Sequence, residues 1–366
     1  MKIKFQIGPS MHTKDSTLRI MTLFSSALTI IYLFGTFRFL KYGLNYVLHS
    51  FALLLATLLT SFICEYVFAY CTKNKKSVLK TQFPFVTPLI IVLMCPIDTS
   101  IYAIIIGTLM GVFFGKLAFG GFGQNIFNPA AIGRAIILNC FAGAGVTSII
   151  TKATPLQTLA SAGWLLDKTS FNHYLNDFGG LKNLWIGDYF VAIGETCTLL
   201  IFILGIILAL LAVIDWYIPL TYLGTIFIGT FILALFKGLG ISYPLTMIAN
   251  GGVAFAGFFM LTDPVTNPNT RQGKIVASII AAFITMLIRY CAILPEGALY
   301  SILIVNILTP AIEKFFEGKN DLNEKRDLMV ILVLFILVVT SIVLMGSGLK
   351  GHYNKETLAI IKEVSL

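Results

Sequence analysis

The sequence predicts an all-α protein that crosses a membrane about ten or eleven times. Of its 366 residues, 57% are hydrophobic and only 12% are charged, whereas soluble domains carry roughly 25% charged residues. Apolar stretches of about 20 residues, the length that spans a bilayer as a helix, recur along the whole chain. Proline, glycine and asparagine interrupt several of them. The predicted fold is therefore a polytopic integral membrane protein with an internal repeat and broken helices.

The apolar segments follow one another closely, so no soluble domain of useful size remains between them. The segment 84–95 is short and is bounded by Pro84, Pro88 and Pro96, which indicates a broken or half-length helix. The predicted segments, in chain order, are 20–37, 45–70, 84–95, 100–116, 127–146, 189–213, 218–236, 244–262, 275–291, 297–312 and 328–346.

The positive charges predict the orientation of the chain. With the N-terminus in the cytoplasm and the segments alternating, fifteen Lys and Arg residues fall in inside loops and six in outside loops, as the positive-inside rule requires. The net charge of +9 then needs no nucleic-acid partner. The one long outside loop is 147–188. The inside set is Lys2, Lys4, Lys14, Arg19, Lys73, Lys75, Lys76, Lys80, Lys116, Arg271, Lys274, Lys314, Lys319, Lys325 and Arg326; the outside set is Arg38, Lys41, Lys152, Lys168, Lys182 and Lys237.

Metal and nucleotide sites are not predicted. The six cysteines form no C-x-x-C pair, and the four histidines show no metal-ligand spacing. A G-x-G-x-x-G fingerprint after a strand is also missing from the sequence. We therefore expect no catalytic residue and no complete active site in this chain alone.

Two polar interruptions occupy corresponding places in the two halves of the chain. "MCPIDTS" (94–100) precedes an apolar helix and then "GGFGQNIFNPA" (120–130); "LTDPVTNPNT" (261–270) precedes an apolar helix and then "LPEGALYSILIVN" (294–306). This shared order indicates an internal repeat, and paired broken helices predict a binding site near the membrane midplane. A re-entrant turn with a packing role alone is the alternative.

The chemistry of these breaks narrows the ligand. Amide donors and acceptors around a planar apolar space suit an isoalloxazine-like ring, and glycines let a flat group approach the backbone. From the residues alone, a flavin carrier and a transporter for a small polar solute both remain open. The residues expected to line the site are Gly121, Gly123, Asn125, Asn128, Asp263 and Asn267.

Four separated motifs carry a resemblance to a known family. They are "FGGFGQNIFNPAAIGRA" (119–135), "IGETCTL" (193–199), "FFMLTDPVTNPNTRQGK" (258–274) and "LPEGALYSILIVNILTPAIE" (294–313). Together they resemble the D subunit of the Rnf complex, the ion-translocating ferredoxin:NAD oxidoreductase. The same family includes the B subunit of the Na⁺-translocating NADH:quinone reductase. The resemblance covers residues 1–316 as one membrane domain and leaves 317–366 as a C-terminal extension with an extra transmembrane helix.

The resemblance implies an electron carrier with two flavins. One is an FMN joined covalently through its phosphate to a threonine in the extracytoplasmic loop, and "TKATPL" (151–156) places it on Thr154. Lys152 stands where the family motif usually has glycine, and Ile149 stands where it usually has an acid. The second is a non-covalent riboflavin in the membrane region, for which the breaks at 125–128 and 263–267 are the expected lining.

Ionisable residues inside apolar segments are usually functional. The resemblance places Glu65 and Glu313 where the related quinone reductase subunit holds acids implicated in Na⁺ uptake. Glu195 and Glu296 are the other acids expected on an ion pathway. Pairing with a buried arginine or capping of a helix is the alternative for each acid. The buried bases expected as such partners are Arg134 and Arg289.

The resemblance also implies a setting in the cytoplasmic (inner) membrane of the cell. The expected partners are other Rnf subunits of the A, B, C, E and G types, a flavin-attaching transferase and membrane lipid. The chain would pass electrons between ferredoxin and NAD while Na⁺ or H⁺ crosses the membrane. A B-type subunit of the quinone reductase is one alternative. A solute channel or transporter on the same repeat scaffold is an alternative of another class.

Overall fold

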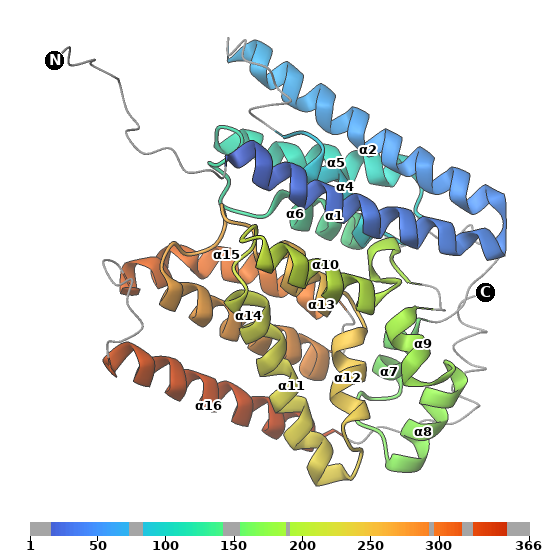
Figure 1. The fold of residues 1–366 in the computed structure, drawn as a ribbon, viewed down its shortest axis with the longest axis vertical. Coiled ribbons are helices and arrows are strands. Elements are labelled where there is room, and N and C mark those ends of the chain that lie inside the picture. Colours follow the sequence, from blue (N-terminus) through green and yellow to red (C-terminus); the bar gives the residue numbers. More distant parts are fainter. Residues whose placement is uncertain are drawn as a thin grey trace.

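The computed structural model describes residues 16–72, 83–141, 154–187, 191–292, 296–316 and 325–349. Across these ranges the chain is helical and forms no β-strand, and one isolated bridge joins Pro96 to Ala192. Seven of the described helices are long and apolar enough to cross a membrane. The predicted all-α membrane fold is confirmed, and Figure 1 shows most of the long helices packed side by side.

The seven long helices account for seven of the predicted apolar segments. Their outward faces expose many leucine, isoleucine and phenylalanine side chains, as expected for helices surrounded by hydrocarbon. These helices are α1 (Thr17–Arg38), α2 (Leu44–Cys71), α5 (Ile101–Gly115, followed by η2, Leu117–Phe119), α11 (Tyr217–Lys237), α14 (Arg271–Ala292), α15 (Gly297–Phe316) and α16 (Lys325–Ser347).

Three further predicted segments form short helices. α4 (Val86–Met94) is the half-length helix expected between the prolines. α6 (Pro129–Cys140) and α10 (Thr198–Leu210) are shorter than the segments 127–146 and 189–213. For α10 the reason is irregular backbone through residue 197, which includes η3 (Ile193–Glu195) and delays the start of the helix.

The segment 244–262 is broken, which the sequence analysis did not predict. α12 (Ser242–Ala249) is followed by an interruption at residues 250–252. After it, the chain continues at an angle of 69° as α13 (Val253–Phe255) and the π-helix η4 (Ala256–Met260). Gly251 and Gly252 adopt φ of 70° and 67°, a left-handed conformation that glycine adopts without strain. The described chain therefore has a third break, within one of the predicted apolar segments.

The cap, residues 154–187, covers one end of the helical body and appears light green in Figure 1. It comprises α7 (Pro155–Ser161), α8 (Lys168–Asp177) and α9 (Gly180–Ile186). Tyr174 is buried, and its hydroxyl donates a hydrogen bond of 3.0 Å to the Pro155 carbonyl. Trp164 is buried against Tyr290 and Arg289 of the helical body. The cap is the described part of the predicted outside loop; residues 147–153 and 188 lie outside the described residues.

Two helical hairpins form the centre of the molecule, α5 with α6 and α14 with α15. Glycines allow α5 and α6 to approach closely, since a Cβ on Gly111 would lie 2.6 Å from the Pro129 carbonyl oxygen. α6 also packs against α15, so the hairpins contact each other. They contain the helices of the two units that the sequence predicted to be repeats.

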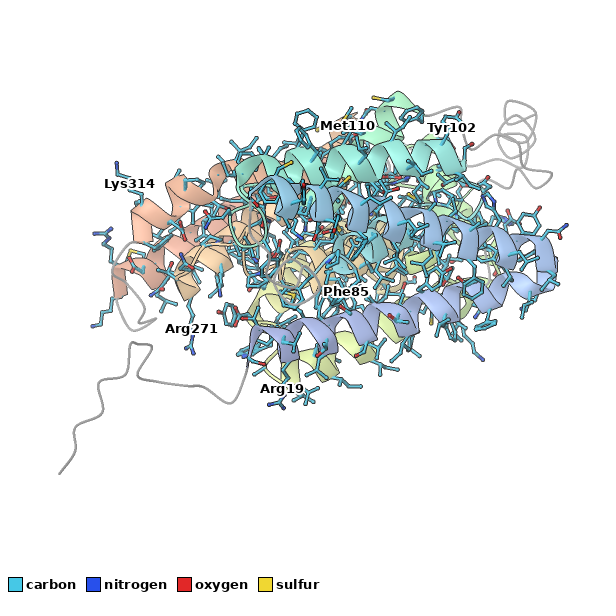
Figure 2. The ribbon with its side chains drawn as sticks, turned by 90° about the horizontal axis from the view of Figure 1, so that it is seen from above. Arg19, Phe85, Tyr102, Met110, Arg271 and Lys314 are labelled. Carbon is cyan, nitrogen blue, oxygen red and sulfur yellow. The ribbon has the colours of Figure 1, made fainter. Side chains whose placement is uncertain are left out.

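The two ends of the helical body carry the charges that the topology prediction separated. Arg19, Arg271 and Lys314 lie toward one end, called here the pocket end, and Tyr102 lies toward the other, called the cap end (Figure 2). The helix directions put the described cations of the predicted inside set at the pocket end and those of the outside set at the cap end. The side of the membrane that each end faces stays a prediction.

The C-terminal extension contributes α16, which packs on α11 and α14. Close contacts of Gly229 with Ile342 and of Gly346 with Leu233 seat this helix against α11. A helix long and apolar enough to span a membrane is thus present where the sequence predicted one. Residues 317–324 and 350–366 lie outside the described part of the extension.

Candidate functional site

The first break, residues 120–128, is irregular backbone between η2 and α6. Gly120, Gly121 and Gly123 adopt φ of 113°, 103° and 87°, so the chain turns where other residues would be strained. Asn128 then caps α6: its Oδ1 accepts hydrogen bonds from the backbone N–H groups of residues 130 and 131 at 3.0 and 3.3 Å. The Asn128 N–H donates to Asn306 Oδ1 of α15 at 3.0 Å. α6 therefore begins inside the protein.

The second break, residues 261–270, folds around Asp263. Its carboxylate accepts hydrogen bonds from the Val265 N–H at 3.2 Å and from the Thr266 hydroxyl at 3.3 Å. Burial raises the pKa of the Asp263 carboxyl, and these two hydrogen bonds partly oppose the rise. The Asn267 amide donates to the Leu261 carbonyl and closes the turn. This turn presents Asp263 to the interior.

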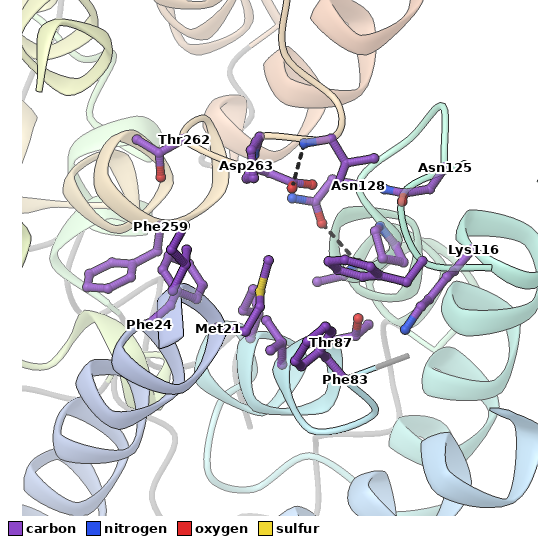
Figure 3. Close-up of a pocket in the computed structure, with 18 of the residues that line it drawn as sticks. Met21, Phe24, Phe83, Thr87, Lys116, Asn125, Asn128, Phe259, Thr262 and Asp263 are labelled. Carbon is purple, nitrogen blue, oxygen red and sulfur yellow. Dashed lines mark hydrogen bonds between the residues drawn. The ribbon is translucent and has the colours of Figure 1, made fainter. Parts of the chain in front are cut away.

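The two breaks meet at one pocket with a cavity volume of about 70 Å³ (Figure 3). Asn125, Asn128 and Asp263 line it, as expected. The pocket is not lined by Gly121, Gly123 or Asn267. A Cβ atom on Gly123 would have no neighbouring atom within 4 Å. The structure thus brings together three of the six predicted lining residues, which come from both halves of the chain.

Several pocket residues were not predicted. Phe24 and Phe259 form one wall, and Lys116 lies on the opposite side of the pocket (Figure 3). Phe122 also lines the pocket, with its ring beside the Lys116 ammonium. Phe122 lies within the first break, and Lys116 lies four residues before it. Their positions in the sequence could therefore have indicated that they line the pocket. The contribution of α1 through Phe24 depends on tertiary packing and gave no local signal.

A buried ion pair lies at the edge of this pocket. Lys116 Nζ and Glu65 Oε1 are 2.7 Å apart, and the two side chains are 4% and 0% exposed. Glu65 is thus at the pocket end of α2, as expected, but paired within the protein. Glu313 of α15 is at the same end and half-buried; its Oε1 accepts hydrogen bonds from the Asn269 N–H and side-chain amide at 3.0 and 2.6 Å.

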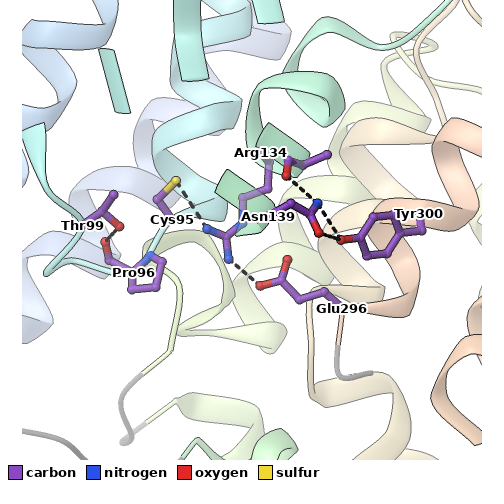
Figure 4. Close-up of polar contacts among 8 residues, drawn as sticks. Cys95, Pro96, Thr99, Arg134, Asn139, Glu296 and Tyr300 are labelled. Carbon is purple, nitrogen blue, oxygen red and sulfur yellow. Dashed lines mark hydrogen bonds and ion pairs between the residues drawn. The ribbon is translucent and has the colours of Figure 1, made fainter. Parts of the chain in front are cut away.

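A second charged cluster lies near the cap end. Arg134 forms an ion pair with Glu296, and its Nη1 lies 3.8 Å from Cys95 Sγ (Figure 4). Glu195 lies within electrostatic reach of Arg134 and Arg289, and the Gly252 N–H donates to its carboxylate. Glu195 and Glu296 are therefore brought together with the arginines that the sequence analysis gave as alternative partners.

Arg289 stabilises the third break. Its Nη1 donates to the Met247 carbonyl at 2.9 Å and its Nη2 to the Asn250 carbonyl at 2.8 Å. The Thr198 hydroxyl donates to the Ala249 carbonyl at 3.0 Å. Carbonyls at the end of α12, which have no partner within the helix, are thereby satisfied without water. The sequence "NGG" at 250–252 is the local pattern that could have indicated this break, although it was not used to predict it.

Thr154 begins α7 at the cap end. Its half-buried side chain accepts a hydrogen bond from the Gln157 N–H at 3.2 Å, and the Gln157 side chain accepts one from the Thr154 N–H at 3.4 Å. This reciprocal pair is a capping box. The Leu156 side chain, two residues later, lies so close to Gly251 that a Cβ atom on Gly251 would clash with Leu156 Cδ2. The helix that carries Thr154 therefore packs on the third break; Ile149, Thr151 and Lys152 lie outside the described residues.

A multi-pass helical protein whose broken helices meet at an internal pocket is typical of membrane proteins that bind a ligand at membrane depth. The chain belongs to the family described as NQR2, RnfD, RnfE, which matches residues 4–321.

Three relatives show how far the similarity extends. The D subunit of the proton-translocating ferredoxin:NAD(+) oxidoreductase complex of Clostridium ljungdahlii is 33% identical over 326 residues, 85% of this chain and 94% of the relative. The D subunit of the Na(+)-translocating complex of Acetobacterium woodii is 34% identical over 237 residues, 63% of this chain and 70% of the relative. The B subunit of the Na(+)-translocating NADH-quinone reductase of Ectopseudomonas mendocina is 31% identical over 252 residues, 64% of this chain and 60% of the relative.

Proposed function

We propose that this chain is the electron-carrying membrane subunit of an Rnf-type complex, which couples electron transfer between ferredoxin and NAD to the movement of Na⁺ or H⁺. The observation that carries the proposal is the pocket, which two sequence-distant breaks form within a chain of this family. The relatives similar over 85% of this chain include a D subunit of a ferredoxin:NAD(+) oxidoreductase complex.

The pocket suits a planar ring without a phosphate, such as riboflavin. Its aromatic walls fit a flat apolar ring, while Asn125 and Asn128 offer amide groups to polar ring edges. Among the described lining residues the charged side chains are Lys116 and Asp263. A single lysine already paired with Glu65 is poorly suited to hold a dianionic phosphate, which arginine clusters usually bind.

Thr154 is our proposed attachment point for a covalent FMN. The flanking "ATPL" agrees with the family motif, and the hydroxyl is half-buried at the cap end. The hydrogen bond from the Gln157 N–H uses an oxygen lone pair, which an ester oxygen retains. The Lys152 and Ile149 departures fall in residues that the structure does not describe.

One short element connects the two proposed flavin sites. The helix with Thr154 packs on Gly251, and Phe259 lines the pocket. Gly251 and Phe259 are eight positions apart along α13 and η4, at most about 12 Å at the α-helical rise of 1.5 Å per residue. When bound, the two flavins would supply electron transfer. The chain's own residues hold them on either side of this element and exclude water from the path.

The ion route is proposed at the pocket end, through Glu65 and Glu313. A buried or half-buried acid at a helix end attracts cations, because field lines concentrate in a low-dielectric mouth. Glu195 and Glu296 were also expected on the route, but their arginine and backbone partners favour the structural alternative for both.

Setting and partners follow from the same proposal. We place the chain in the cytoplasmic membrane, with the pocket end facing the cytoplasm and the cap outside. Rnf subunits of the A, B, C, E and G types would surround it, and a flavin transferase would load Thr154. The similarity to a B subunit of the quinone reductase over 64% of the chain keeps a B-type role as the second candidate.

The test is the ultraviolet fluorescence of the denatured protein band, because a covalent flavin survives denaturation. The wild type should fluoresce, and Thr154→Ala should not. Thr154→Asn is the sharper variant, since asparagine caps a helix as well as threonine does but offers no hydroxyl for esterification. Thr158→Ala is the matched control, because the buried Thr158 hydroxyl donates to the Thr154 carbonyl one turn away.

A dark wild-type band from a fully assembled complex would reject the flavin carrier and favour the solute channel or transporter. A fluorescent Thr154→Asn band would reject Thr154 as the attachment point. A flavin peptide mapped to Thr151 or Thr158 would also do so.

A further inference from the structure

Lys116 places a charged side chain on the pocket wall with only 3% of the residue exposed. Its backbone is fixed: the Lys116 N–H donates to the Val112 carbonyl, and its carbonyl accepts from the Gly121 N–H, both at 3.1 Å. Its ammonium is 2.7 Å from Glu65 Oε1 and 5.7 Å from the centre of the Phe122 ring. The ammonium therefore lies between a buried acid and an aromatic pocket wall.

Glu65 is only half satisfied by this contact. Within the described residues, neither its second oxygen, Oε2, nor the Ser61 hydroxyl one turn earlier has a partner with full hydrogen-bond geometry, although the Ser61 side chain lies beside the carboxylate. A buried polar atom of this kind calls for an explanation, such as an ion or water that binds there. Glu65 thus presents an open ligand position beside the ammonium that neutralises it.

Lysine is suited to a changing partner. Its ammonium is a compact charge on a flexible four-carbon stem, whereas arginine holds its partners in a rigid planar fork. Asp263 on another wall of the pocket lies within electrostatic reach of Lys116. Rotation about the side-chain bonds can therefore move the ammonium from Glu65 toward the pocket while the backbone stays in place.

We propose that Lys116 is a counter-charge shared between Glu65 and the pocket ligand. While the ligand is neutral, Lys116 neutralises Glu65. When the ligand gains negative charge, Lys116 turns to it, and Glu65 binds a cation in place of the ammonium. The ligand class is a planar, carbonyl-bearing redox ring, so this inference rests on the proposed function.

The charges balance in this exchange. One electron, delivered to the ligand by a one-electron donor, adds one negative charge to the pocket. The Lys116 ammonium compensates that charge, and the Glu65 carboxylate takes up one H⁺ or one Na⁺ from the pocket end. The net charge of the buried site is unchanged, so reduction of the ligand drives cation uptake.

The experiment is a redox titration of the non-covalent flavin in the purified complex, followed by absorbance. One arm varies Na⁺ at constant ionic strength, and the other varies pH at fixed Na⁺, so the two cations are distinguished. In the wild type, the one-electron potential should rise with one of them, by up to 59 mV for each tenfold change.

The variants separate the two halves of the proposal. Lys116→Met should lower the potential and abolish its cation dependence, because Glu65 then holds a cation in both redox states. Glu65→Gln should abolish the dependence but keep the potential high, since Lys116 still faces the ring. The double variant Lys116→Met with Glu65→Gln buries no unpaired charge and guards against misfolding. Lys274→Met is the control, because Lys274 pairs with Asp215 at 2.5 Å and neither residue lines the pocket.

A wild-type potential and a wild-type slope in Lys116→Met would overturn the inference and leave the proposed function intact. Loss of the slope in Lys274→Met would also overturn it, because the effect would then not belong to Lys116. A wild-type complex that releases no flavin on denaturation would overturn the proposed riboflavin and this inference together.

Discussion

The charged clusters at the two ends of the molecule differ in what satisfies them. At the cap end, Arg289 donates to the backbone carbonyls of Met247, Asn250 and Gly251 and Arg134 pairs with Glu296, while the Nε atom of each arginine has no partner among the described residues. At the pocket end, Lys116 pairs with Oε1 of Glu65, and the other oxygen of Glu65 accepts no hydrogen bond from described residues. One cluster is directed at the protein's own backbone and the other at an open pocket.

This difference helps to distinguish buried charges that stabilise the fold from buried charges that serve a function. A broken helix in hydrocarbon leaves carbonyl and N–H groups that need partners, and rigid arginine forks supply them at the third break. Lys116 and Glu65 beside the pocket pair with each other instead. Buried charge alone therefore does not indicate function; the identity of the partner does.

The largest effect is expected for Arg289→Leu. The change removes the donors to the Met247 and Asn250 carbonyls, and each buried group left unpaired costs about 1–3 kcal/mol. Thermal unfolding in detergent, followed by size-exclusion chromatography, should show a strong loss of folded protein. Arg271→Leu, at the exposed start of the same helix, is the control and should unfold like the wild type. A stable Arg289→Leu protein would mean that the third break needs no arginine.

A smaller loss is expected for Gly251→Ala. Its φ of 70° strains any other residue by about 1–2 kcal/mol, and the new Cβ would lie 2.7 Å from Arg289 Nη2 and also meet Leu156. Gly240→Ala is a matched control, because Gly240 has φ of 69° with open space around it. The difference between their melting temperatures isolates the crowding. Equal losses would contradict the close packing of the cap helix on the break.

The smallest effects are expected for the acids at the pocket end. Glu65→Gln keeps the shape of the side chain but removes the charge that binds the cation, and it should raise the half-saturating Na⁺ concentration of the complex by at least about tenfold, or roughly 1.4 kcal/mol. Glu313→Gln should raise it about two- to fivefold, because this acid is partly exposed and solvent screens it. Flavin content should not change. A Na⁺ titration at constant total salt measures both, and an unshifted midpoint in both variants would place the ion route elsewhere.

Much of the fold followed from apolar length and breaking residues. Proline marked the half-length α4, and the asparagine and proline at 128–129 marked the start of α6. The third break was missed because a segment of apolar residues surrounds Gly251 and Gly252, and glycine alone does not predict a bend in a membrane helix. The carbonyl groups at this break accept hydrogen bonds from Arg289, which lies 38 residues after Gly251. That contact depends on tertiary packing, which a local sequence pattern does not predict.

The candidate site followed from sequence only in part. Asn125, Asn128 and Asp263 were predicted because polar residues within apolar segments are tolerated only where protein buries them or where they line a cavity. Gly121, Gly123 and Asn267 belong to the same breaks but shape or close the turns instead of facing the pocket. The pairing of Glu65 with Lys116 joins α2 to the end of α5, and only the packing of these helices brings the two charges together.

The most direct test of the account is whether the pocket between the two breaks holds the releasable flavin. The wild-type complex should release one riboflavin per chain on denaturation, measured by chromatography with fluorescence detection. Ala130→Leu and Thr87→Leu, which enlarge two lining side chains, should lose it while the covalent flavin on the band persists. Ala311→Leu, on an exposed position of α15, should keep both. Full riboflavin content in both pocket variants would contradict the account, because the ring would then bind elsewhere.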